Sequence, residues 1–426
     1  MKCFIGGFMP IITTQDFTEE GRLQIGTFAP DIGQPAENVL VRISYSGDDE
    51  ILEEMITDAS GQTPVINLPA PPIEYSMELT ETRPYSDYDI RVIMDGYRPM
   101  IIQGVQILPE TTAFQDIRLQ PENNNSVGER IVSISDHTLW GTFPPKTPEA
   151  EVKELPPSTG YVVLPNPVIP EFIIVHDGRP NDASAPNYWV PFAEYIKNVA
   201  SCEIYANWPQ STITANILAI LSFTLNRVYT EWYRGQGFDF TITSSTAYDH
   251  AFSYGRNIFE EISTVVDDIF TSFITRPGIR QPLLTQYCDG KNVICPNWMT
   301  QWGSKTLGDQ GYSAIDILKS FYGYDIYLMQ AQRVQGVPVS FPGTPLQTGS
   351  TSEYVRIIQE QLNAISNKYP AINKVRVDGV FGPETRRAVE TFQEIFRLSA
   401  DGIVGFNTWY RISHIYVAVT RIAELS

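Results

Sequence analysis

The chain has 426 residues, of which 42% are hydrophobic and 19% charged. This length predicts two or three domains with real apolar cores, and the composition excludes a disordered protein. The net charge of −19 argues against nucleic acid or anionic membranes as partners, because both would repel the chain, whereas glycan chains remain possible.

The N-terminal segment MKCFIGGFMPIITTQ is a poor match to a signal peptide, because two glycines and a proline interrupt its apolar stretch. If the protein acts outside the cytoplasm, this N-terminal segment does not indicate how it is exported. No apolar run reaches the roughly 18 residues of a membrane span, so no membrane insertion is expected.

Residues 1–120 contain short runs in which apolar and polar residues alternate. The runs are GRLQIGTF, ENVLVRISY, YDIRVIM and FQDIRLQP, and turn signals such as Asp95-Gly96 separate them. Alternation with a period of two predicts an all-β sandwich without a catalytic constellation. The order of the motifs PAENVLVRI, TDASGQTPVINLPAPP and YDIRVIMDGYRP resembles carboxypeptidase regulatory-like (transthyretin-like) domains.

Residues 121–172 have many prolines and no sustained periodicity, so they are predicted to be an extended linker. Exposed irregular backbone is also where proteases cut. We therefore expect an activating cleavage between about Glu149 and Val163. A plain spacer that is never processed is the alternative.

Residues 173–332 contain a candidate catalytic carboxylate, Glu203. It is predicted to lie on a loop ahead of a long helix that Trp208 and Pro209 open. Apolar side chains at 213, 217, 220, 221, 225, 228, 229 and 232 predict a one-sided buried stripe for this helix. A second amphipathic helix is predicted from apolar residues at 258, 262, 265, 266, 269, 270 and 273.

The segment from Pro191 to Pro209 resembles the SpoIID family of peptidoglycan lytic transglycosylases. In that family a motif of the form YLxxVVxxEMxxxWP carries the catalytic glutamate, and Glu203 occupies its place here. The run from Met299 to Ile326, with a predicted helix cap at Ser313, resembles the closing motif of the same family. The resemblance implies an α+β catalytic domain in which Glu203 is catalytic and Tyr287, Gln301 and Trp302 bind substrate. For Trp302, a place in the core is an equal alternative.

Relatives in this family often bind zinc in the segment that corresponds to Phe238–Phe252. Here serine, threonine and alanine replace the cysteines, and His250 alone cannot hold the ion, so we expect neither a metal nor any other cofactor. Cys202 with His250 could suggest a cysteine peptidase, although their spacing matches no known signature. A zinc amidase would need clustered histidines, and the four in this chain are scattered. Cys288 and Cys295 could pair or stay free.

Residues 345–426 contain an internal repeat, in which DGVFGPET at 378–385 is echoed by DGIVGFNT at 401–408. Each copy predicts a glycine turn that leads into a helix, and a preceding helix is predicted to be capped by Ser350 with Glu353. The pattern, including Gln359, Gln393 and Trp409, resembles the small three-helix peptidoglycan-binding domain, followed by a C-terminal helical tail.

Taken from end to end, the chain resembles spore-cortex-lytic enzymes of the SleC kind. The resemblance implies a lytic transglycosylase located in the spore cortex, coat region or cell wall, with an N-terminal pro-domain that a subtilisin-like protease removes. Because that chemistry needs one carboxylate and no water, a lone glutamate favours it over hydrolysis. A muramidase-type hydrolase that uses the same glutamate and a non-catalytic wall-binding scaffold remain alternatives.

Overall fold

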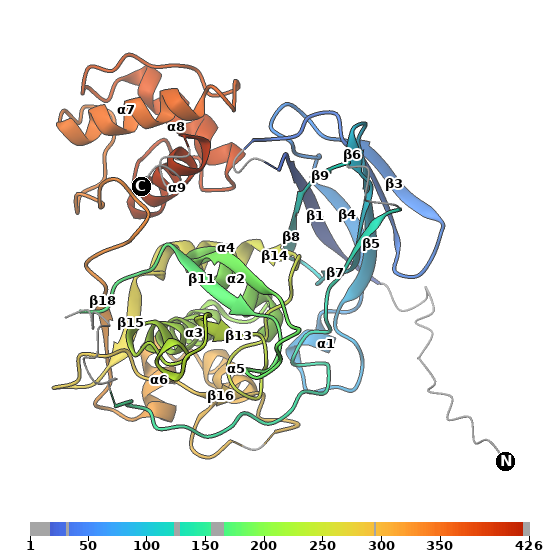
Figure 1. Ribbon diagram of the computed structural model, residues 1–426, viewed down its shortest axis with the longest axis vertical. Coiled ribbons are helices and arrows are strands. Elements are labelled where there is room, and N and C mark those ends of the chain that lie inside the picture. The colour runs from blue at the N-terminus through green and yellow to red at the C-terminus, as the bar shows by residue number, and fades with distance from the viewer. Residues whose placement is uncertain (1–17, 31–33, 123–127, 155–165, 294, 421–426) are drawn as a thin grey trace.

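The structure, a computed structural model, describes residues 18–30, 34–122, 128–154, 166–293 and 295–420. It has a β-sheet region at the N-terminus, a mixed central region and a helical C-terminal region (Figure 1). Within the described residues, every helix is too short or too polar to cross a membrane.

Two sheets pack face to face in the N-terminal region (Figure 1). Side chains that alternate along the strands, such as Leu23 and Ile25 or Val41 and Ile43, fill the space between the sheets and are fully buried. The strands of this region are β1 (Glu19–Phe28), β2 (Leu40–Tyr45), β3 (Ile51–Ile56), β4 (Ile66–Ala70), β5 (Ser86–Ile93), β6 (Tyr97–Arg98), β7 (Met100–Ile107), β8 (Thr112–Arg118) and β9 (Gln120–Pro121), with a short helix α1 (Glu74–Met77).

Two strands from beyond residue 120 complete these sheets. Strand β10 (Arg130–Ser133) pairs in parallel with β7, and β14 (Ile258–Phe259) pairs antiparallel with β8. The strand orders are therefore β14-β8-β1-β4 and β10-β7-β5-β2-β3. Because β14 belongs to the central region by sequence, backbone hydrogen bonds join the sandwich to the region that follows it.

The central region is built around α3 (Gln210–Tyr229), in which every side chain from Ala215 to Arg227 is buried. The predicted one-sided stripe is therefore wrong for its middle, which is covered on all sides. Around it lie α2 (Phe192–Glu203), α4 (Glu260–Ile269), α5 (Gln301–Asp309), α6 (Ala314–Tyr322) and the pair β15 (Ser272–Thr275) and β18 (Tyr327–Gln330). The remaining elements are β11 (Phe172–His176), β12 (Asn187–Pro191), β13 (Ile242–Thr243), the 3-10 helix η2 (Arg234–Gln236), β16 (Tyr287–Cys288) and β17 (Met299–Thr300).

The second predicted helix is shorter than its apolar pattern suggested. Residues 258–259 form β14 and residues 272–275 form β15, so only Glu260–Ile269 is helical. The cap at Ser313 is confirmed, because its side chain accepts a hydrogen bond from the backbone N–H of Asp316.

Three helices form the C-terminal region: α7 (Glu353–Ile365), α8 (Pro383–Ile395) and α9 (Phe406–Thr420). The cap of α7 is Ser352, not the predicted Ser350. Gln359 and Gln393 play the same part in the two repeats, because each side-chain carbonyl accepts the N–H of the turn glycine, Gly379 or Gly402, at 2.8 Å. The residues that define the repeat thus stabilise the fold of this region. The region docks on both others, through Arg411 with Glu194 and Arg397 with Asp116.

Candidate active site

Glu203 is the last residue of helix α2, and not a loop residue ahead of α3 as the sequence predicted. Residues 204–209 then connect to α3, for which Pro209 is the N-cap. The Glu203 side chain is 4% exposed. Its carboxylate therefore projects from a packed helix end, which fixes its position.

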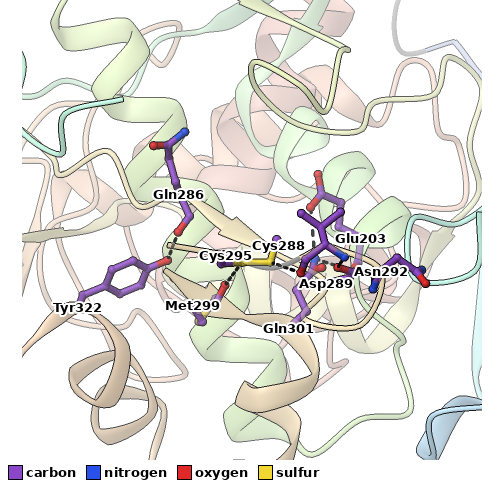
Figure 2. Close-up of a disulfide and its surroundings, with 10 residues drawn as sticks. Glu203, Gln286, Cys288, Asp289, Asn292, Cys295, Met299, Gln301 and Tyr322 are labelled. Atoms are coloured by element: carbon purple, nitrogen blue, oxygen red, sulfur yellow. Dashed lines mark hydrogen bonds between the residues drawn. A yellow bond between two sulfur atoms is a disulfide. The ribbon is translucent and has the colours of Figure 1, made fainter. Parts of the chain in front are cut away.

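Two donors hold Glu203 in place. The backbone N–H of Ala251 donates to Oε1 at 2.7 Å. The Gln301 side-chain amide donates to the Glu203 backbone carbonyl at 2.8 Å and is 3.3 Å from Oε2. Gln301 is the first residue of α5, so two helix ends meet at this point, as Figure 2 shows.

Burial raises the pKa of the Glu203 carboxyl above its ordinary value, although Lys146, the Ala251 N–H, Tyr287 and Gln301 oppose the shift. The helix position adds to the effect of burial. Glu203 lies at the C-terminal end of α2, where the helix dipole disfavours a negative charge. The sequence had suggested the opposite polarity, because it placed the glutamate before the N-terminus of α3.

This raised pKa predicts the direction of the pH dependence. If Glu203 must begin as an acid, activity is present below its folded-state pKa and is lost as the pH rises through that value. We expect the pH profile of kcat/KM on soluble glycan fragments to fall on its alkaline side at a pH above the ordinary glutamate value. A profile that instead rises through this range would contradict the role of acid.

The cavity beside Glu203 is too small for a sugar ring. Its volume is about 60 Å³, whereas pockets that hold small ligands measure about 300–1,000 Å³. Glu203, Tyr287 and Gln301 all line it. The predicted linker also lines the cavity, through Thr138, Gly141, Phe143, Pro144 and Lys146.

Residues 136–154, which we call the strap, run across the central region without forming a helix or strand. The side chain of Thr138 donates to the Cys202 carbonyl at 3.0 Å, the N–H of Thr147 donates to Ala247 at 2.6 Å, and the Gln286 amide donates to Thr147 at 2.8 Å. This part of the predicted linker is therefore packed against the protein and is not a free spacer. Of the predicted cleavage range, residues 155–163 lie outside the described residues.

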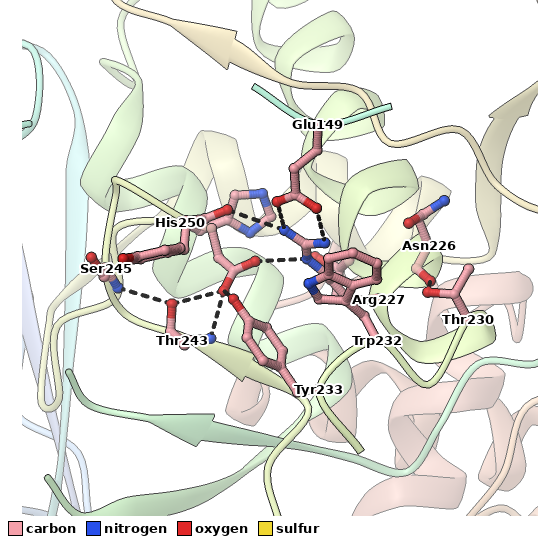
Figure 3. A network of polar contacts seen from close by, with 12 residues as sticks. Glu149, Asn226, Arg227, Thr230, Trp232, Tyr233, Thr243, Ser245 and His250 are labelled. Atoms are coloured by element: carbon pink, nitrogen blue, oxygen red, sulfur yellow. Dashed lines mark hydrogen bonds and ion pairs between the residues drawn. The ribbon is translucent and has the colours of Figure 1, made fainter. Parts of the chain in front are cut away.

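A buried ion pair fastens the strap (Figure 3). Both carboxylate oxygens of Glu149 accept from the Arg227 guanidinium, at 2.9 and 2.6 Å. Arg227 also donates to Asp249 at 2.7 Å, and the side chains of Arg227 and Asp249 are fully buried. Tyr233 and Thr243 in turn donate to Asp249. Removing one member would leave a buried charge without its partner, which is costly.

Lys146 brings the charge of the strap close to the candidate acid. Its ammonium lies 4.3 Å from the centre of the Tyr287 ring and 5.0 Å from that of Phe223. Burial lowers the pKa of Lys146, and the negative charge of Glu203 partly offsets that shift. Strap and carboxylate thus interact electrostatically as well as sterically.

The predicted site residues fall into two groups. Glu203, Tyr287 and Gln301 line one cavity, although they are far apart in the sequence. Trp302 does not line it. Its ring centre lies 5.1 Å from that of Trp208 and 6.3 Å from that of Tyr205, and the side chain is 9% exposed, which favours a role in the core.

The sequence missed Lys146, Glu149, Arg227 and Asp249. One signal was available, namely a lone arginine inside the apolar run that forms α3. A fully buried arginine needs carboxylate partners, but nothing in the sequence says which ones.

Cys288 and Cys295 form a disulfide that closes the turn bearing Asp289 (Figure 2). Closing a loop across 7 residues contributes about 2.5 kcal/mol in the chain-entropy estimate. We expect the double variant Cys288→Ser/Cys295→Ser to melt several degrees lower than the wild type. A reductant should lower the melting temperature of the wild type and leave that of the double variant unchanged. Equal melting of the two proteins without reductant would show that the bond does not stabilise the fold.

The expectation that residues 238–252 hold no zinc stays a prediction. His250 is fully buried, its Nδ1 lies 3.1 Å from the Tyr195 hydroxyl, and burial lowers its pKa well below the ordinary value. Within the described ranges, no three histidine, cysteine or acidic side chains gather as a metal site would require.

The cysteine peptidase hypothesis also lacks the needed contacts. Cys202 lies 3.7 Å from the side-chain oxygen of Asn198, and burial raises the pKa of its thiol to about 11. His250 instead packs against Tyr195, Phe223 and Tyr287. A buried thiol with a raised pKa is a poor nucleophile.

Residues 351–412 match a family described as "Putative peptidoglycan binding domain". The zinc D-Ala-D-Ala carboxypeptidase of Streptomyces albus G is 40% identical over 68 residues, which are 16% of this chain and 25% of that enzyme. The chain therefore spans about a quarter of the length of that curated relative.

Two solved structures are also similar to parts of the chain. The SleB N-terminal domain is 34% identical and covers 18% of this chain and 99% of its own, with a TM-score of 0.16. The minor pilin GBS52 of Streptococcus agalactiae is 18% identical and covers 26% of this chain and 49% of its own, with a TM-score of 0.18. TM-scores this low carry no argument about the fold. The family match leaves the residues around Glu203 outside its range.

Proposed function

Because residues 351–412 belong to the family of putative peptidoglycan binding domains, we propose that the chain is a peptidoglycan lytic transglycosylase that cleaves spore cortex. The domain supports binding to peptidoglycan and a location in the cell wall. The observation that carries the catalytic part is Glu203, a buried carboxyl with a raised pKa that two donors hold in a cavity.

In the proposed reaction, Glu203 gives its proton to the oxygen of the bond between N-acetylmuramic acid and N-acetylglucosamine. The C1–O bond breaks and the leaving sugar departs with a free hydroxyl. The C6 hydroxyl of the same muramic acid attacks C1 and forms the 1,6-anhydro ring, and the Glu203 carboxylate takes up the C6 hydroxyl proton. Gln301 and the Ala251 N–H keep the carboxylate aimed during both transfers.

A second carboxylate in the cavity favours one alternative, a muramidase-type hydrolase. Asp289 lines the same cavity as Glu203. Its two oxygens, however, accept from the backbone N–H groups of Asn292 and Val293, at 2.7 and 2.9 Å. A carboxylate engaged in its own turn is poorly placed to activate water, so transglycosylation is the better supported reaction.

The strap supports a proenzyme. It fills the space next to Glu203 that a glycan would need, so the full chain is closed and proteolysis followed by strap release opens it. The sandwich approaches the same region, because the Ser76 carbonyl accepts from Trp208 and the Thr80 carbonyl from Lys291, both at 2.8 Å. The strap thus covers the residues around Glu203 more directly than the sandwich does.

Mass spectrometry of muropeptides released from purified cortex, by the protein with and without residues 1–162, tests this function. Anhydro ends from the shortened protein support a transglycosylase, and reducing ends indicate hydrolysis with Asp289 as a candidate partner. If neither form releases fragments while both bind the wall, the protein is a scaffold.

A further inference from the structure

A second, larger cavity lies at the other end of the central helix, where α3 ends at Tyr229. Its volume is about 360 Å³, within the range of about 300–1,000 Å³ that is typical of small-ligand sites. We call it the Trp189 cavity. Its aromatic lining consists of Phe172, Trp189, Tyr229, Trp232, Tyr233 and Phe240.

Trp189 is the least expected of these residues. It lies on β12, an edge strand, and 68% of the side chain is exposed. Its ring contacts Phe172 edge-on at 6.4 Å between ring centres. A large apolar side chain that is left this open and forms the wall of a cavity adds little to the core, and such exposure is typical of a binding surface.

The charged groups of the cavity are mostly paired already. Arg234 lies 3.8 Å from Glu231, and Glu149 and Asp249 neutralise Arg227. Glu171 and Glu231 line the cavity together with these two arginines. A site without a strong excess of one charge suits a neutral ligand better than a charged one.

The backbone at the cavity is held in an uncommon conformation. Glu231 has a φ of 47°, in the left-handed region that disfavours residues with a Cβ. The turn that results carries Glu231 and Trp232 into the lining. This φ is that of a Schellman motif, which ends α3 through bonds from the Glu231 N–H to the Val228 carbonyl and from the Trp232 N–H to the Arg227 carbonyl. The turn therefore places lining residues and is not itself an indication of binding.

The cavity and the strap are neighbours. The Lys153 ammonium lies 4.0 Å from the centre of a Trp232 ring, and Arg227, which lines the cavity, also holds Glu149. The strap thus extends from the Glu203 cavity toward the Trp189 cavity. Of the residues that the structure describes, those that line the latter fall between 168 and 335, outside the strap.

We propose that the Trp189 cavity is a saccharide-binding site for an N-acetylated hexosamine unit of the peptidoglycan glycan, distant along the strand from the unit cleaved at Glu203. The inference rests on the proposed function and extends it. Aromatic rings stack on the apolar C–H face of a hexose, and the carboxyl and guanidinium groups bond its hydroxyl and acetamido groups. A charged stem peptide would find no net attraction.

The test uses the full chain with Glu203→Gln, so that no probe is cleaved. The probe is the β-1,4-linked tetramer of N-acetylglucosamine, which is soluble and has no peptide. Adding Trp189→Ala should weaken its Kd about tenfold. Tyr324→Ala is the matched control, because Tyr324 is an aromatic residue of the same region that is 86% exposed. It should leave the Kd unchanged, and the C-terminal module is common to all three proteins.

An unchanged Kd in the Trp189→Ala protein would overturn the proposal. A second contrary result would be that a peptide-bearing muropeptide binds in a Trp189-dependent way while the plain tetramer does not bind. The site would then recognise the peptide and not the sugar. Equal melting temperatures of the variants show that the fold is intact. The readout is binding and not product, so a failure here is separate from a failure of Glu203 to cleave glycan.

Discussion

Replacing Glu203 with glutamine is expected to lower the release of anhydro-muropeptides about a thousandfold, within the range for loss of a general acid or base. Glutamine has the same shape and can still accept the hydrogen bond that Ala251 donates at 2.7 Å, but it has no proton to give to the glycosidic oxygen. The measurement is the initial rate of anhydro-end formation by protein that has been trimmed of its N-terminal part.

The control for this prediction is Glu260→Gln, which changes an exposed glutamate in the first turn of α4. It should retain full activity. The Glu203 variant should melt at or above the temperature of the wild type, because a buried carboxyl with a raised pKa does not stabilise the fold. If the Glu203 variant still dissolves the wall, another residue is the catalyst and the proposed reaction is wrong.

Glu149→Gln should activate the uncut chain. The variant loses the charge of a carboxylate that accepts from Arg227 at 2.9 and 2.6 Å, a loss of about 1.5–3 kcal/mol for hydrogen bonds to charged groups. That loss raises the share of molecules with an open strap about ten- to a hundredfold. The rate of cortex solubilisation by unprocessed protein should increase by a similar factor.

Glu154→Gln is the matched control, since Glu154 is an exposed glutamate on the same strap. It should leave the uncut chain as inactive as the wild type. The wild type and the Glu149 variant are both measured before and after proteolysis. Equal activity of the two proteins would show that the strap does not limit access to Glu203.

The sequence located the candidate acid and two of its neighbours because their motifs are local. Glu203, Tyr287 and Gln301 were identified separately, and the fold brings them to one cavity. The error over Glu203 was one of boundary. The apolar pattern of residues 192–203 is short and was taken for a loop. The helix that ends at Glu203 was therefore missed, and so was the sign of the helix-dipole effect on its pKa.

The strap and β14 could not be predicted for a different reason. Extended, proline-rich segments have no period, and their partners lie far away in the sequence, as with Gln281, which accepts from the Lys153 N–H at 3.1 Å. Likewise, Ile258 and Phe259 continue the apolar pattern of a helix, and only pairing with Phe114 and Ala113 makes them a strand. Local patterns contain no information about such pairing.

The pairing of β14 with β8 also bears on whether activation can be reversed. An N-terminal fragment that left the protein would carry β8 away with its outer backbone groups unpaired, and such an edge readily captures other strands. Self-association of the freed fragments would then compete with return to the parent molecule. The shared sheet would thus make the proposed departure of the fragment a one-way event, as an irreversible activation requires.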